Sequence, residues 1–238
     1  MSMVILKRSA YDYEKLKPAF FEIMDAIGGS VITKNSRVVI KPNLLSSAAP
    51  DRAMITHPMV VRAAVEYVLQ KGGVPQVSDS PAIGEFKRIL EDGGFTGALE
   101  GLDAEMKEFT ASVPVDIGLP FRKIEIARDA VEADVIINLP KLKTHTQMLL
   151  TLGVKNLFGC IVGLRKPDWH FRAGIDRDLF ARLLVQISNV LKPCLTVIDG
   201  ILAMEGQGPG KSGTPKELWI LMGSSDPVSL DIAVCRIL

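Results

Sequence analysis

The strongest constraint on the fold is a strand–helix–strand pattern between residues 38 and 79. An apolar run at 38–41 precedes a loop, apolar residues recur at helical spacing from Pro58, and a second apolar run follows at 74–79. A strand, a helix and a strand in this order form a right-handed crossover between neighbouring parallel strands. We therefore predict an α/β protein with a mostly parallel or mixed sheet and helices on both faces.

The rest of the chain continues this alternation. Further strands are expected at 4–6, 124–127, 134–138, 194–199 and 217–222, and further helices at 12–27, 83–92, 176–191 and from 226 onward. The stretch 93–120 has no clear period, so no element is assigned there. We expect one α/β domain over residues 1–238, a length that suits a single domain. The last helix reaches Leu238 without a capping residue, so the chain is expected to be truncated at its C-terminus.

Composition and charge bear on partners and location. The formal net charge is +1, aromatic residues are scarce at 6%, and apolar runs stop short of a bilayer-spanning length. The N-terminus lacks the apolar core of a secretory signal. We expect a cytoplasmic protein that binds neither nucleic acid nor membrane.

The three cysteines, Cys160, Cys194 and Cys235, are dispersed and cannot supply four thiolates to an iron–sulfur cluster. No cofactor is therefore expected in this chain, and the thiols should be packed as small apolar groups.

Polar side chains follow several predicted strands at the points where these strands end. They are Lys41 and Asn43; Ser78, Asp79 and Ser80; Asn138, Lys141, Lys143 and His145; and Asp199. Because the carboxyl ends of parallel strands meet at one rim of a sheet, ligand sites form there. We expect Lys41, Asp79, Lys141, His145 and Asp199 to line one cleft.

The segment 139–172 is locally basic. It holds six Lys or Arg residues against a single acid, Asp168, together with His145, His170 and the peptide GVKNLFG. A solvated basic face is one interpretation. The other is an anion site, because closely spaced cations complement a carboxylate or phosphate. On this interpretation Lys155 and His170 approach the same cleft.

The Gly-rich stretch EGQGPGKSGTP at 205–215 resembles a phosphate loop only superficially. Glu205 stands where the Walker pattern requires glycine, and Pro215 prevents a helix from opening after Lys211 and Ser212. The stretch either offers backbone amides to an anion or is a flexible connection.

The motifs KPNL, SDSP, LPKLKTH, GVKNLFG, VIDG, MEGQGP and SSDPVSLDI together resemble the uncharacterised family called domain of unknown function 362. Members commonly carry a ferredoxin-like module with two iron–sulfur motifs. The resemblance therefore implies 4Fe–4S clusters in a module beyond this chain, or a ferredoxin-like redox partner. A more distant similarity in style is to the nickel-pincer lactate racemases.

Two hypotheses follow for function. The first is an enzyme, with a redox-linked role, that binds a small anionic metabolite. Its catalytic candidates are Lys141, His145 and His170, and its substrate- or anion-binding candidates are Lys41, Asn43, Asp79, Lys143, Lys155, Asn156, Asp199 and Glu205. The second is a non-catalytic module that delivers a metal or cofactor; the sequence places no carboxylate or thiolate partners for a metal beside the histidines, so no metal site is assigned. An enzyme should hold the histidines beside the lysines in one dry pocket, whereas a delivery module should spread them over an open face.

Overall fold

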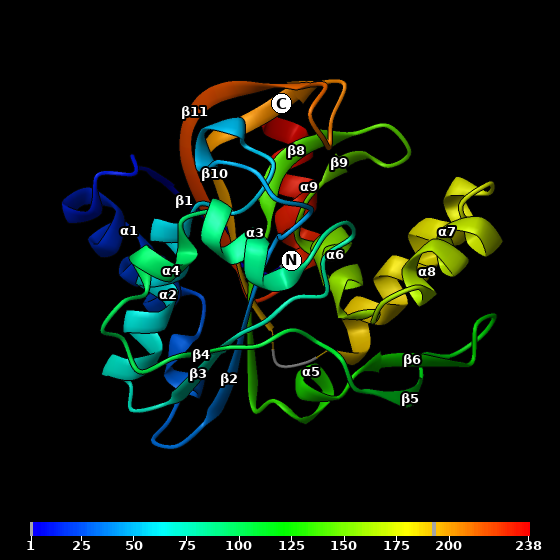
Figure 1. The fold of residues 1–238 in the computed structure, drawn as a ribbon, viewed down its shortest axis with the longest axis horizontal. Helices are drawn as coiled ribbons and strands as arrows, with labels where there is room; N and C mark the ends of the chain where they lie inside the picture. Colours follow the sequence, from blue (N-terminus) through cyan, green and yellow to red (C-terminus); the bar gives the residue numbers. More distant parts are fainter. Residues whose placement is uncertain (1, 192–193) are drawn as a thin grey trace.

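A computed structural model describes residues 2–191 and 194–238. One large mixed sheet is covered by helices on both faces, which confirms the predicted fold class (Figure 1). Its strands lie in the order β1 (Ile5–Arg8), β11 (Gly213–Ser224), β10 (Cys194–Gly206), β7 (Val135–Leu139), β2 (Arg37–Pro42), β3 (Val74–Val77) and β4 (Glu105–Met106), while β8 (Lys141–His145) pairs with β10 and with β9 (Leu149–Thr151). A separate small sheet pairs β5 (Ser112–Asp116) with β6 (Lys123–Ala127).

The helices connect and cover these strands. They are α1 (Tyr13–Ala26), α2 (Pro58–Gln70), α3 (Phe86–Asp92), α4 (Phe95–Ala98), α5 (Arg128–Glu132), α6 (Gly153–Asn156), α7 (Arg165–Ala173), α8 (Arg177–Val190) and α9 (Pro227–Ile237), with the 3₁₀ turns η1 (Gly29–Val31), η2 (Pro50–Arg52) and η3 (Leu157–Cys160). Within the described residues, none of the helices combines the length and the apolar composition that crossing a bilayer requires.

The centre of the sheet is parallel. Strands β10, β7, β2, β3 and β4 are neighbours in this order and run in the same direction. The predicted β2–α2–β3 crossover is confirmed, because β2 and β3 pair from Arg37 with Val74 to Ile40 with Val77. The antiparallel strands β11 and β1 complete one edge. The parallel centre brings several strand carboxyl ends to one rim.

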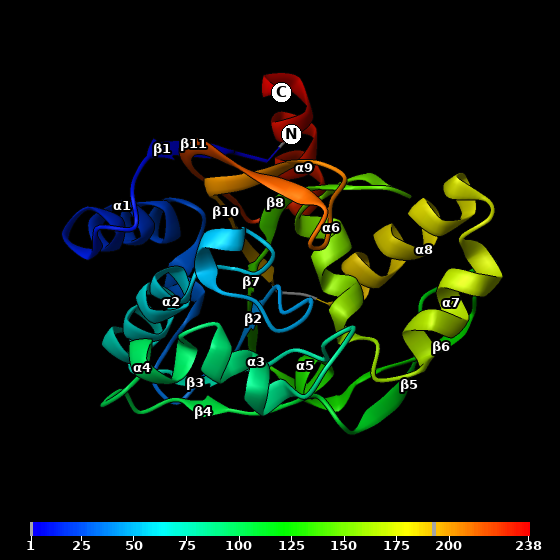
Figure 2. The ribbon, with the colours of Figure 1, turned by 45° about the horizontal axis from the view of Figure 1, so that its top comes forward.

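The two faces of the central strands belong to different cores. Val38 and Ile40 of β2 pack in the cluster that contains α1 and α2, whereas Val39 packs with Phe180 and Leu183 of α8 on the other face. Figure 2 shows α1 and α2 on one side of the sheet and α8 on the opposite side. Successive strand side chains point to opposite faces, so a strand that is apolar at every position must be covered twice.

Strand β8 was not predicted. Both β7 and β8 run parallel to β10, and Pro140 separates them while its carbonyl accepts a hydrogen bond of 2.9 Å from Asp199 N. In KLKTH only Leu142 is apolar, so the sequence lacks the alternation typical of a strand, and lysine and histidine are unusual in a central strand. Tertiary pairing with β10 decided this element.

Several helix starts carry the caps that their sequences indicate. Asp12 accepts a hydrogen bond from Glu14 N at the start of α1, and Asp226 accepts one from Val228 N at the start of α9. His57 caps α2 through Nδ1, which accepts from Met59 N, with Pro58 at the first helical position. His57 is therefore the N-cap of α2.

Candidate functional site

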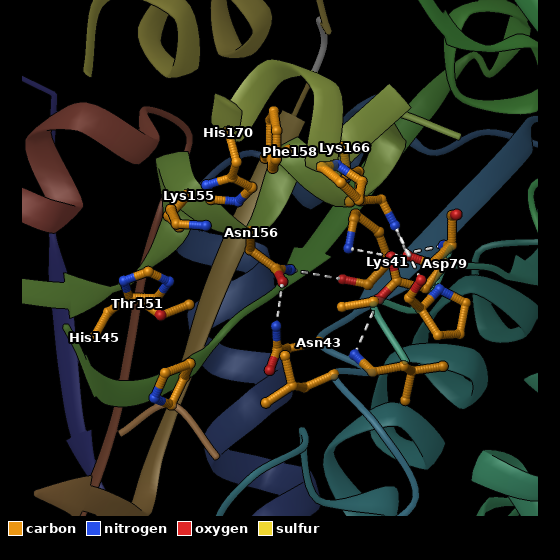
Figure 3. Close-up of a pocket in the computed structure, with 18 of the residues that line it drawn as sticks. Lys41, Asn43, Asp79, His145, Thr151, Lys155, Asn156, Phe158, Lys166 and His170 are labelled. Atoms are coloured by element: carbon orange, nitrogen blue, oxygen red, sulfur yellow. Dashed lines mark hydrogen bonds and ion pairs between the residues drawn. The ribbon is translucent and has the colours of Figure 1, made fainter. Parts of the chain in front are cut away.

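A pocket of about 370 Å³ lies at the carboxyl ends of β2, β3 and β8, where α6, η3 and α7 cover the rim (Figure 3). Its lining includes these predicted site residues: Lys41, Asn43, Asp79, Lys143, His145, Lys155, Asn156 and His170. The structure therefore brings most of the candidates together. Lys166 also lines the pocket. Lys166 is one of the cations of the basic segment 139–172, but it was not among the predicted site residues.

Lys41 and Asp79 form a buried ion pair in the pocket. Lys41 Nζ lies 2.8 Å from Asp79 Oδ1 and donates to Pro42 O at 2.9 Å. The carboxylate also accepts from Leu44 N and Ser80 N, each at 2.9 Å. With three hydrogen bonds around it, the pair is held in one geometry.

Gly159 allows this geometry. A Cβ atom at Gly159 would lie 2.4 Å from Asp79 Oδ1 and 2.5 Å from Lys41 Nζ. Both distances are shorter than van der Waals contact, so the η3 backbone passes the ion pair where no side chain fits. This explains the glycine that ends GVKNLFG.

Lys143 is 1% exposed and makes two short hydrogen bonds, to Asn43 Oδ1 and to Met54 O, each at 2.6 Å. Burial is the main cause that lowers the pKa of Lys143 to about 7, and the neighbouring Lys155 and Lys141 add to it. A lysine in this state is only partly charged near neutral pH.

A chain of asparagine amides orients these groups. Asn43 Nδ2 donates to Asn156 Oδ1 at 3.1 Å, Asn156 Nδ2 donates to Asn138 Oδ1 at 2.8 Å, and Asn138 Nδ2 donates to Gly153 O at 2.9 Å. The direction of the chain leaves Asn43 Oδ1 free to accept from Lys143. Asn156 thus positions Asn43.

Lys166 and Lys155 occupy the side of the pocket formed by the basic segment. Lys166 Nζ donates to Ser80 O and, at 3.3 Å, to Pro81 O, and burial lowers its pKa to about 8. Lys155 Nζ lies over the rings of Phe158 and Phe180, 5.3 and 5.7 Å from their centroids. Burial, followed by repulsion from Lys166 and Lys41, lowers the pKa of Lys155 to about 8.

The two pocket histidines have opposite hydrogen-bonding roles at Nδ1. His145 Nδ1 accepts from Gln147 N at 3.1 Å and from Met148 N at 3.2 Å, so its proton is on Nε2. Gln147 Nε2 donates to Gly174 O at 2.7 Å, which turns Gln147 Oε1 toward His170 Nδ1 at 3.0 Å. His170 therefore carries its proton on Nδ1, and its Nε2 is an acceptor.

Both histidines are neutral near pH 7. Burial, followed by repulsion from Lys155, lowers the pKa of His145 and of His170 to about 4. The pocket thus contains one imidazole with a donor at Nε2 and one with a lone pair at Nε2. Such a pair can donate a hydrogen bond to a ligand from one ring and take a proton from it at the other.

Lys141 and Asp199 were predicted in the same cleft, and this prediction is wrong. Lys141 Nζ donates to Asp199 Oδ2 at 2.8 Å and to Tyr11 Oη at 2.7 Å, and Tyr11 Oη donates to Asp199 Oδ1 at 2.7 Å. Asp199 Oδ2 also accepts from the backbone of His57, whose ring stacks on Tyr11 at 3.6 Å. This closed network satisfies both charges, so they form a buried structural cluster and do not line the pocket.

Glu205 is also outside the pocket. Its side chain is exposed and lies 3.5 Å from Lys216 on the β10–β11 hairpin. The long antiparallel extension of these strands carries Glu205 away from the rim.

The cysteines differ from expectation as well. Cys160 is buried, as expected, but Cys235 is exposed; the side chain of Cys194 lies outside the described residues.

No group of three His, Cys, Asp or Glu side chains that could hold a metal ion occurs among residues 2–191 and 194–238.

A second, mostly apolar cavity of about 400 Å³ lies between α8 and α9, and Lys155 lines it as well as the first pocket. Lys155 is therefore the polar residue between two cavities.

Fold and site together define an α/β protein with a lysine- and histidine-lined pocket at the carboxyl ends of its parallel strands. The chain belongs to the family described as domain of unknown function (DUF362), whose model matches residues 38–236. The resemblance read from the motifs is thereby confirmed.

The chain is also similar to two individual proteins, one in sequence and one in fold. The thylakoid-associated protein sll1697 of Synechocystis sp. (strain ATCC 27184 / PCC 6803 / Kazusa) is 38% identical over 239 residues, which cover 100% of this chain and 74% of that protein. The lactate racemase apoprotein from Thermoanaerobacterium thermosaccharolyticum shares the fold with a TM-score of 0.57 at 13% identity, over 98% of this chain. The chain spans 56% of that racemase chain, and at this identity the similarity concerns the fold alone.

Proposed function

We propose that the pocket binds a small anionic metabolite and that His145 and His170 transfer protons to and from it. The observation that carries the proposal is the charge of the lining. Lys41, Lys143, Lys155 and Lys166 face the pocket, and Asp79 is the only carboxylate among the described residues that line it. Like charges this close repel one another in a low-dielectric site, and an anion would offset that repulsion.

The arrangement of the histidines supports an enzyme over a delivery module. His145 and His170 lie in the same pocket as the lysines, and the pKa of each is lowered to about 4. Perturbed titration of grouped residues in a pocket is typical of catalytic sites. The protein that shares this fold is called a lactate racemase, and lactate is a small carboxylate. Carboxylates are therefore the first anions to test.

Calorimetric titration with sulfate, phosphate, lactate and pyruvate at pH 7 tests the proposal. A Lys143→Gln and Lys166→Gln double variant should weaken binding by about tenfold or more, since each charge-assisted hydrogen bond contributes about 1.5–3 kcal/mol. The matched control is Lys211→Gln with Lys216→Gln, two lysines that the pocket lining does not include. Equal binding of every probe by the pocket variant and the parent would refute the proposal.

A further inference from the structure

The four pocket lysines are not equivalent, because three of them are held by polar partners. Lys41 Nζ is bonded to Asp79 and Pro42 O, Lys143 Nζ to Asn43 and Met54 O, and Lys166 Nζ to two carbonyls, Ser80 O and Pro81 O. Among the described residues, Lys155 Nζ has neither a hydrogen-bond acceptor nor a carboxylate partner; its contacts are the rings of Phe158 and Phe180.

The surroundings of Lys155 favour a neutral amine. Two phenyl rings desolvate Nζ, and Lys166 and Lys41 repel a charge there. Desolvation and a neighbouring cation are the two devices that turn a lysine into a nucleophile. In Lys143, by contrast, Nζ donates two hydrogen bonds of 2.6 Å. A third N–H can still be offered to an anion, but these two bonds restrict attack by Nζ on a carbonyl carbon.

We propose that Lys155 forms a Schiff base with the carbonyl carbon of a small 2-oxo acid whose carboxylate is bound by the other pocket lysines. The inference rests on the proposed function and names the class of anion. Lys41, Lys143 and Lys166 supply the cations for the carboxylate, and Lys155 is left to react.

The chemistry balances without an oxidant or reductant. The Lys155 ammonium first loses a proton, and the Nζ lone pair attacks the carbonyl carbon while the C=O π pair moves to oxygen, which takes up a proton. The resulting carbinolamine loses one water molecule as the nitrogen lone pair forms the C=N bond. In sum, an ammonium and a ketone give a protonated imine and water.

The histidines are suited to these proton transfers. His170 packs against Phe158 and Phe180, the same rings that Lys155 contacts, and its Nε2 lone pair can take the proton that Nζ loses. Figure 3 shows Lys155 and His170 on the same wall of the pocket. His145, with its proton on Nε2, can donate a hydrogen bond to the carbonyl oxygen, and the proton that His170 has taken from Nζ can then pass to that oxygen.

Reductive trapping tests the inference. The protein is incubated with pyruvate and sodium cyanoborohydride at pH 8, and the product is analysed by intact mass and peptide mapping. The expected result is one reduced pyruvate on Lys155, formed faster than on any exposed lysine and suppressed by saturating sulfate. Methyl pyruvate, which lacks the carboxylate, should lose this preference for Lys155.

Variants separate the reaction from binding. Lys155→Arg keeps a cation but should remove the adduct, whereas Lys211→Arg should trap pyruvate as the parent does. If pyruvate binds the parent but no adduct forms on Lys155, or if the adduct forms on Lys143 or Lys166, the Schiff-base inference is overturned and the proposed function stands. If neither pyruvate, sulfate nor phosphate binds, both are overturned. Peptide mapping of the parent decides the question even if Lys155→Arg does not fold.

Discussion

Lys141 Nζ lies 2.8 Å from Asp199 Oδ2, and both side chains are completely buried. The pair joins β8 to β10 at the point where Lys141 and Asp199 are in register. Its burial makes the cost of breaking it large, since the remaining charge would be left without a partner.

Lys141→Met should therefore lower the free energy of unfolding by about 3–5 kcal/mol, measured by urea denaturation. The matched control is Lys216→Met, whose partner Glu205 is exposed and whose loss should cost less than about 1 kcal/mol. Folded Lys141→Met should bind sulfate nearly as the parent does, because Lys141 does not line the pocket. A loss of stability no greater than that of Lys216→Met would contradict the structural role.

Gly159→Ala should displace the Lys41–Asp79 ion pair, because the new Cβ would lie within 2.5 Å of Lys41 Nζ. We expect a stability loss of about 1–3 kcal/mol, typical of overpacking, together with weaker sulfate binding. Gly97→Ala is the control, since a Cβ there meets no atom within 4 Å. Thermal unfolding and calorimetry measure both effects, and a Gly159→Ala protein indistinguishable from the control would disprove the close approach.

Anion binding should weaken as the pH rises from 7 to 9. The pKa of Lys143 is lowered to about 7 and the pKa of Lys155 and of Lys166 to about 8, so the empty pocket loses charge over this range. A bound anion favours the charged lysines and raises these pKa values, so binding takes up protons. Calorimetry of sulfate binding in buffers with different ionisation enthalpies measures this uptake. Equal affinity at pH 7 and pH 9 would argue against the lysines as ligands.

His145 and His170 should be neutral at pH 6 with opposite tautomers, Nε2–H in His145 and Nδ1–H in His170. Their pKa values are lowered to about 4, below the ordinary value of 6.5. The stability that comes from the neutral form is present above pH 6.5 and is lost as the pH falls through 4. Long-range ¹⁵N–¹H NMR spectra report the tautomers. His57, whose Nδ1 also accepts a hydrogen bond, serves as an internal reference for the Nε2–H form. An imidazolium signal from either pocket histidine at pH 6 would contradict the prediction.

Asp231→Asn should change how stability depends on pH. Asp231 accepts from Gly153 N and Val154 N, and burial raises its pKa to about 7. For a raised pKa, the stabilisation is complete below the unfolded value near 4 and is lost as the pH rises to 7. The variant should therefore make the slope of unfolding free energy against pH more positive, by up to about 1.4 kcal/mol per pH unit between pH 4 and 7. Parallel curves for variant and parent over this window would show that Asp231 does not titrate there.

The sequence by itself determined the layered fold and most of the pocket. The period of the apolar residues from 38 to 79 predicts β2, α2 and β3, because a buried parallel strand and an amphipathic helix have different spacings. Once those strands are parallel neighbours, their carboxyl ends must share a rim, so Lys41 and Asp79 must meet.

Only the tertiary structure decided which lysine of KLKTH belongs to the pocket. Lys141 and Lys143 are two residues apart on one strand, and alternation alone would give them the same surroundings. The register with β10 shifts between them, since Lys141 is opposite Asp199 whereas Lys143 is opposite Met204. Asp199 therefore neutralises Lys141, whereas the side chain of Lys143 lines the pocket and donates a hydrogen bond to Asn43. A register shift depends on pairing between distant segments, and no local pattern in either segment encodes it.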